Sequence, residues 1–167
     1  MSLPDDLLEQ AKHLANREPK RPRQASLRRA VSTAYYALFH LLISEATLNW
    51  KRAEQRPRLA RLFEHGKMRE ASDGQSRQCK DFMKSNPPPG PDLDCAVQLE
   101  LVARTFSQAQ QQRHTADYDN SKQWTRTEVL TQIALVDAAF QSWHTIRDES
   151  DAQTYLVSLL GKPRGHN

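Results

Sequence analysis

Apolar residues recur at three- and four-residue steps along most of the chain, and this spacing predicts amphipathic helices. The longest regular run extends from about Gln24 to Asn49. Its predicted buried stripe consists of Leu27, Val31, Ala34, Tyr35, Leu38, Leu41 and Leu42. A second long helix is predicted from Asp92 or Asp94 to Arg113, ended by the polar stretch 114–124. Its stripe consists of Val97, Leu101, Val102, Thr105, Phe106 and Ala109.

Capping and breaking residues place the shorter elements. Ser2 caps a first helix that ends near Arg17, and Thr125 with Glu128 forms a capping box before another helix. Pro57 opens a third segment, for which Asp73-Gly74 is the predicted terminating turn. The remaining expectations are a short amphipathic piece at 79–83, an exposed proline-rich loop at 85–91, and a last helical segment with Ala152, Tyr155, Leu156, Leu159 and Leu160.

These elements predict an all-α fold. Short connections between most segments favour an up-and-down bundle of four to five main helices with a short extra C-terminal helix. We expect one domain over residues 1–160 and a frayed tail over 161–167.

The amino-acid composition argues against several classes of protein and of site. The longest mostly apolar run, Tyr35 to Ile43, is too short to span a membrane, and the N-terminus has no secretory pattern, so we expect a cytoplasmic protein. Cys79 and Cys95 are expected to be free thiols in that compartment. The six histidines are scattered and no glycine-rich phosphate loop precedes a helix, so neither a metal site nor a cofactor is predicted.

Charge is unevenly distributed along the chain. Between Arg17 and Arg69 there are 13 Lys and Arg against 4 Asp and Glu, a net charge of +9, whereas the rest of the chain carries −5. Such a basic segment attracts nucleic acid or an acidic partner, or it joins two copies of the chain. A solvated face that serves only solubility is the alternative.

The central helix carries a second face beside its apolar stripe. Arg29, Ser32, Tyr36 and His40 follow one another at three- and four-residue steps, so they share one side of the helix. This face is a candidate for binding phosphate or a partner. Alternatively, its polar groups form hydrogen bonds inside the bundle or with water.

Two stretches carry a resemblance to a known family. The string from Arg28 to His40, RRAVSTAYYALFH, resembles the characteristic helix of the HEPN domain family, with a basic residue, a Ser and a Tyr pair before an aromatic residue. The string from Arg113 to Asp119, RHTADYD, is similar to the Arg-x-x-Ala-Asp-Tyr motif of one branch of that family. The resemblance covers roughly Leu3 to Leu160.

The resemblance implies a helical bundle that forms homodimers and is often paired with a nucleotidyltransferase antitoxin. Many members are metal-independent ribonucleases whose site resembles an Arg followed, after four to six residues, by His. Here Tyr118, Asp119 and Asn120 occupy the positions of that His. His114 serves beside Arg113 only if the helix unwinds directly after Arg113.

Three functions follow as hypotheses. The first is a HEPN-like module of a toxin–antitoxin or defence-type system that binds RNA, a nucleotide or a nucleotidyltransferase partner through Arg29, Ser32, Tyr36, His40, Arg113, Asp117 and Tyr118. The second is a metal-independent ribonuclease toxin whose dimer cleft uses Arg113 with His114 as catalytic residues, or Arg113 with Tyr118 in a reduced role. The third is a structural helical scaffold. Asp117 and Asp119 are also candidates to pair with Arg113 or Arg29 as a structural clasp.

Overall fold

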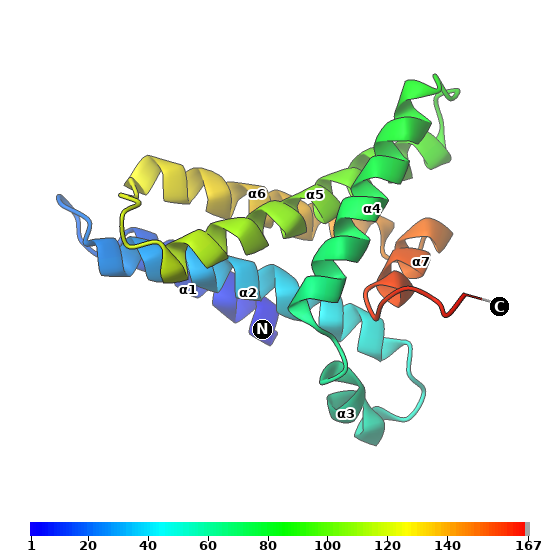
Figure 1. Cartoon of the computed structure of the whole chain (residues 1–167), viewed down its shortest axis with the longest axis horizontal. Helices are drawn as coiled ribbons and strands as arrows, with labels where there is room; N and C mark the ends of the chain where they lie inside the picture. The colour runs from blue at the N-terminus through cyan, green and yellow to red at the C-terminus, as the bar shows by residue number, and fades with distance from the viewer. Residues whose placement is uncertain (166–167) are drawn as a thin grey trace. The chain divides into compact units, whose positions relative to one another are not determined.

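The computed structural model describes residues 1–165, and within them it contains helices and no strand, which confirms the all-α prediction (Figure 1). The up-and-down arrangement of four to five main helices stays a prediction. The helices are α1 (Leu3–Ala15), α2 (Gln24–Leu48), the short 3₁₀ helix η1 (Ala53–Gln55), α3 (Arg56–Ala60), α4 (His65–Lys84), α5 (Pro91–Tyr118), α6 (Arg126–Ile146) and α7 (Ser150–Ser158).

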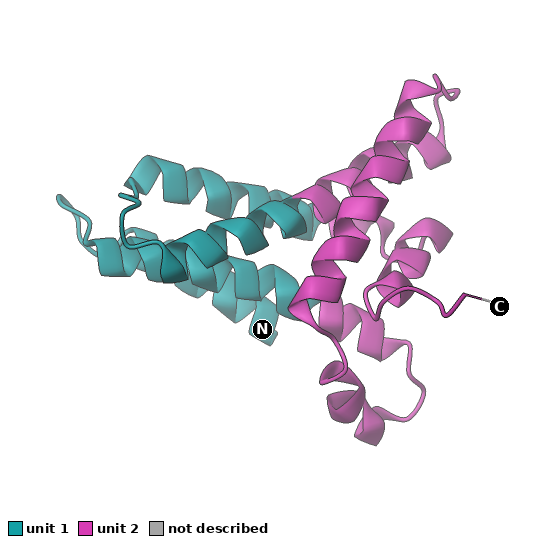
Figure 2. Ribbon diagram, viewed as in Figure 1, with its two compact units in different colours: residues 1–41, 105–141 teal, residues 42–104, 142–167 magenta. Residues whose placement is uncertain are grey.

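The chain divides into two compact units, shown in Figure 2. Unit 1 comprises residues 1–41 and 105–141, and unit 2 comprises residues 42–104 and 142–167. The helices α2, α5 and α6 each contribute residues to both units. The single domain over 1–160 stays a prediction.

Unit 1 pairs its helical segments in antiparallel fashion. On α2 and α5, Arg28 reaches the backbone carbonyl of Ala116 while the ring of Tyr35 lies 5.6 Å from that of Phe106, so the two segments run in opposite directions. All seven residues of the predicted α2 stripe are buried. Six of the seven, all but Leu42, belong to unit 1, and this part of the stripe forms its centre.

The backbone amides at two helix starts in unit 1 find the side-chain partners that the sequence predicts. The Thr125 hydroxyl accepts a hydrogen bond from the Glu128 amide at 3.1 Å, and the Thr125 amide donates to the Glu128 carboxylate at 3.3 Å. A similar reciprocal pair joins Ser2 and Asp5 at the start of α1. Both capping boxes provide partners for backbone amides that a helix start leaves without intrahelical acceptors.

Unit 2 is built around α4 and α7. The buried hydroxyls of Ser72 and Tyr155 lie 2.7 Å apart and hydrogen-bond to each other. Glu100, 7% exposed, accepts from the Ser76 hydroxyl at 3.2 Å and from the Arg104 guanidinium at 3.0 Å. Cys79 and Cys95 are buried free thiols in the same unit.

The third predicted helix is wrong in its bounds. The chain forms the five-residue α3 and then a separate twenty-residue α4 that continues through the predicted terminating turn at Asp73-Gly74. A single Gly in a helix costs only about 1 kcal/mol relative to Ala. Burial of Met68, Ser72, Ser76 and Cys79 on one face of α4 outweighs that cost.

The predicted end of the long helix is also wrong. α5 stays helical through Tyr118 instead of breaking after Arg113. Val97 on this helix is 49% exposed and Leu160 after α7 is 39% exposed, although each belongs to the apolar pattern that predicted its helical segment. Residues 161–165 contain no helix, and the remaining two residues of the predicted tail lie outside the described residues.

Across residues 1–165, none of the helices combines the length and the apolar character that crossing a membrane requires.

Candidate anion-binding site

Arg113 on α5 lies against the tyrosine pair of α2. Its guanidinium carbon is 5.2 Å from the ring centroid of Tyr35 and 5.9 Å from that of Tyr36. The side chain is only 14% exposed, so these cation–π contacts form in a poorly solvated setting where they are strongest. Burial raises the pKa of Tyr35, and the Arg113 charge opposes that rise. Tyr35 is therefore a neutral phenol at physiological pH.

A carboxylate one turn along α5 completes this cluster. The Asp117 carboxylate lies 3.6 Å from the guanidinium of Arg113, which agrees with the structural clasp considered from the sequence. The Arg113 Nε atom is buried and has no hydrogen-bond partner among the described residues. Arg113 is thus held by the faces of two aromatic rings, by one long ion pair and by a side-chain hydrogen bond with Tyr35.

Arg28 anchors the end of α5. Its guanidinium donates hydrogen bonds to the backbone carbonyls of Ala116 at 2.9 Å, Asp119 at 2.8 Å and Lys122 at 2.6 Å. Carbonyls at a helix C-terminus lack intrahelical partners and carry the negative end of the helix dipole, so a cation stabilises them. Sequence reasoning did not single out Arg28 as a site residue.

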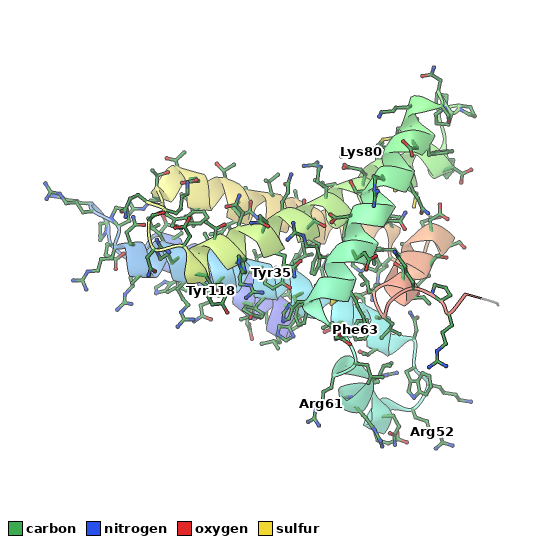
Figure 3. The ribbon with its side chains drawn as sticks, in the orientation of Figure 1. Tyr35, Arg52, Arg61, Phe63, Lys80 and Tyr118 are labelled. Atoms are coloured by element: carbon green, nitrogen blue, oxygen red, sulfur yellow. The ribbon has the colours of Figure 1, made fainter. Side chains whose placement is uncertain are left out.

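Arg29, the next residue, faces a polar hollow. The hollow has a volume of about 380 Å³ and is lined by Ala25, Arg28, Arg29, Ala116, Asp117 and Tyr118; we call it the Arg29 pocket. Arg29 is exposed and has no hydrogen-bond or ion-pair partner among the described residues. Tyr118 is 69% exposed at the C-terminal end of α5, where Figure 3 labels it. The pocket thus offers one unpaired guanidinium and an accessible phenol.

The structure brings together only part of the predicted binding face. Tyr36 contacts Arg113, whereas Ser32 is buried and lines no part of the Arg29 pocket. His40 packs one turn further along α2, with its ring 6.3 Å from that of Tyr36 and 5.2 Å from that of Phe39. Burial lowers the pKa of His40, so its imidazole is neutral at pH 7.

Arg113 and His114 project to different surroundings. While Arg113 lies over the tyrosine pair, the His114 ring is exposed and lies 5.0 Å from the ring of Tyr118. Because α5 remains helical here, successive side chains diverge by about 100°. The unwinding that a catalytic Arg113 and His114 pair requires is therefore not present.

What the site can do chemically is bind an anion. In the Arg29 pocket the Asp117 carboxylate is compensated by Arg113, so a phosphate meets the positive charge of Arg29 beside the Arg28 guanidinium. No cluster of three or more His, Cys, Asp or Glu side chains suited to a metal ion occurs in the described part of the chain. Comparison with protein-family models, with curated proteins and with solved structures finds no match to this chain.

Proposed function

We propose that the chain is a HEPN-like module that binds RNA, with a backbone phosphate in the Arg29 pocket. The observation that carries the proposal is the unpaired, exposed guanidinium of Arg29 in a polar hollow beside Tyr118. A guanidinium binds phosphate oxygens through two parallel hydrogen bonds, which Lys reproduces poorly. The resemblance of the α2 and α5 motifs to the HEPN family supports the same class of ligand.

The proposal assigns Arg113 a structural role. Its contacts with Tyr35, Tyr36 and Asp117 occupy the guanidinium within unit 1, and the family's usual His is replaced. The module therefore binds RNA without a complete catalytic motif of its own. An RNA cleavage assay on the wild type and on Arg113→Ala tests this role, and cleavage by the wild type that the variant loses contradicts it.

Binding to a labelled 12-nucleotide RNA, followed by fluorescence anisotropy, tests the pocket. Arg29→Ala is expected to weaken binding and to reduce the slope of log affinity against log salt by about 0.7, because one phosphate contact is lost. The matched control is Arg126→Ala in the same unit, whose guanidinium is already bonded to the carbonyls of Ala15, Glu18 and Pro19. Equal RNA affinity of Arg29→Ala and wild type refutes the pocket assignment.

The family resemblance extends the proposal to partners and architecture. We propose an up-and-down bundle of four to five main helices that works as a cytoplasmic homodimer, with a nucleotidyltransferase as its antitoxin partner. Light scattering after size-exclusion chromatography tests the dimer directly, because a mass near the 19.2 kDa of one chain contradicts it.

A further inference from the structure

A half-exposed tryptophan follows the end of α2 in unit 2. The side chain of Trp50 is 52% exposed, whereas the other two tryptophans, Trp124 and Trp143, are 3% and 0% exposed. Leu62, beyond α3, is 60% exposed. Large apolar side chains at the surface of this short segment are not needed to stabilise the core, so they are available to a ligand.

Trp50 lines an open hollow between cationic side chains. The hollow has a volume of about 430 Å³ and is lined by Trp50, Arg52, Gln55, Arg58, Leu59 and Leu62; we call it the Trp50 surface. A second hollow of about 180 Å³ shares Trp50 and Leu59 and has an apolar lining of Phe63, Leu156 and other side chains. The indole ring thus contributes to two adjoining hollows that hold no carboxylate.

Positive charge is concentrated beside this ring. Lys51, Arg52, Arg56, Arg58 and Arg61 lie within eleven residues, against Glu54 alone. Lys51, Arg58 and Arg61 have no ion-pair or hydrogen-bond partner among the described residues, and Arg52 and Arg61 extend from the ribbon in Figure 3. These cations are therefore available to phosphate groups.

Arg56 orders the backbone that presents the ring. Its guanidinium donates to the carbonyl of Trp50 at 3.0 Å and to the carbonyl of Leu48 at 3.4 Å. Trp50 consequently lies in a turn whose backbone is held by hydrogen bonds. Because the backbone at Trp50 is already ordered, less conformational entropy is lost when a ligand stacks on its ring.

We propose that the Trp50 surface binds single-stranded nucleic acid, with a base stacked on the Trp50 ring and neighbouring phosphates at Arg58 and Arg61. Every base has an aromatic face and every nucleotide has a phosphate, so an aromatic ring among arginines binds single strands with little sequence preference. The inference deepens the proposed RNA-binding function but uses residues of unit 2.

Nucleic acid fits this surface better than a peptide does. A peptide that binds by strand addition finds no sheet edge in residues 1–165, which contain no strand. An amphipathic acidic helix is the peptide ligand compared with nucleic acid, since it places apolar anchors in hollows of this kind and carboxylates beside the arginines. The closely spaced unpaired cations favour nucleic acid, which carries one negative phosphate per nucleotide. Binding of an acidic peptide is therefore treated as an alternative outcome of the test.

Intrinsic fluorescence gives a direct readout, because Trp50 is the exposed tryptophan of the three. Titrating the full chain with 12-nucleotide oligo(U) or oligo(dT) at low salt is expected to quench its fluorescence and to protect Trp50 from iodide. Equal affinity for the two oligomers indicates recognition of base faces and phosphates, and a preference for oligo(U) adds contacts with the 2′-hydroxyl. Absence of quenching by both oligomers overturns the proposal.

Variants are compared by the anisotropy of the labelled oligomers. Trp50→Ala is expected to weaken binding about 5- to 150-fold, and Trp50→Phe, which keeps a ring, is expected to lose less. Arg58→Gln with Arg61→Gln is expected to reduce the salt slope by about 1.4. The matched control, Arg77→Gln with Lys84→Gln, makes the same charge change on α4 of the same unit and is expected to leave binding nearly unchanged.

The results separate this inference from the Arg29 pocket. If Arg29→Ala weakens binding and neither Trp50 variant does, the pocket stands and the Trp50 surface is refuted. Loss in the Trp50 variants alone supports the surface and refutes the pocket. A blue shift with an amphipathic peptide of Glu and Leu, together with no response to either oligomer, replaces nucleic acid with an acidic helix as the ligand and overturns the proposal.

Discussion

Replacing Arg28 by Ala tests whether the end of α5 is held by that guanidinium. The substitution removes three hydrogen bonds, to the carbonyls of Ala116, Asp119 and Lys122. A charged donor raises the net contribution of a hydrogen bond, but this site is partly exposed and water can replace the donor, so each bond contributes about 0.7–1 kcal/mol, within the ordinary range. We therefore expect Arg28→Ala to lower the free energy of unfolding by about 2–3 kcal/mol.

Arg29→Ala is the matched control, since it removes the same side chain from the adjacent position of the same helix. Arg29 has no partner among the described residues, so its removal is expected to change the free energy of unfolding by less than about 0.5 kcal/mol. For a chain of this length, about 1 kcal/mol corresponds to roughly 2–4 °C in Tm. Arg28→Ala is thus expected to melt about 4–12 °C below Arg29→Ala in circular dichroism.

Hydrogen exchange localises the effect. The backbone amide of Trp124 donates to the side chain of Gln24 at 2.9 Å, in the connection that Arg28 holds to α2. Its exchange is expected to accelerate in Arg28→Ala and to stay close to wild type in Arg29→Ala. Equal melting temperatures and equal exchange of this amide in the two variants refute the role assigned to Arg28.

Three further predictions follow from other parts of the structure. In urea titrations, Arg113→Ala is expected to lower the free energy of unfolding by about 2–3 kcal/mol, because two cation–π contacts and side-chain packing are lost. Asp117→Asn loses only a long, partly exposed ion pair and is expected to lower it by less than about 1 kcal/mol. Gly74→Ala is expected to raise it by about 0.5–1 kcal/mol, since Gly74 is helical and an added Cβ meets nothing within 4 Å; a loss of stability contradicts this account of α4. Burial raises the pKa of Cys95 from about 9 to about 11, so its thiolate fraction at pH 8 is about 100-fold lower than in the unfolded chain; alkylation followed by mass spectrometry is expected to be slow at pH 8 and to accelerate as the pH rises toward 11.

The sequence pattern predicted α2 well because periodicity and burial agree there. Each residue of its apolar stripe is buried, and no breaker interrupts the run. In α4 the two signals disagree. Gly74 is a local signal worth about 1 kcal/mol, whereas the buried face around Met68 and Cys79 depends on distant segments that the sequence does not place.

The end of α5 was misplaced for a related reason. Residues 111–118 are mostly polar, and polar composition alone favours a loop. In the structure, contacts with α2 stabilise the helix there: Arg113 lies over Tyr35, and Arg28 satisfies carbonyls at the helix end. Tertiary contacts therefore overrode a local preference, as they often do.

The candidate site could be predicted only in part. The pairing of Arg113 with Asp117 was among the alternatives, because the two residues are four apart on a helix. Arg28 and Arg29 are adjacent residues of the same type, so the sequence does not tell their roles apart. In the structure Arg28 binds carbonyls at the end of α5, whereas Arg29 is exposed. Their roles depend on which helix packs alongside α2, and that requires the folded structure.

This difference limits how the charge of the basic segment is interpreted. Its +9 counts Arg28 and Arg56, whose guanidinium groups are bonded to three and two backbone carbonyls and face the protein. The proposals use three unpaired cations, Arg29 in unit 1 and Arg58 with Arg61 in unit 2. The slope of log affinity against log salt is then about −0.7 for RNA bound in the Arg29 pocket and about −1.4 for RNA bound at the Trp50 surface. A slope near −6 would mean that most of the segment's charge contacts RNA, and that binding follows total charge rather than these two sites.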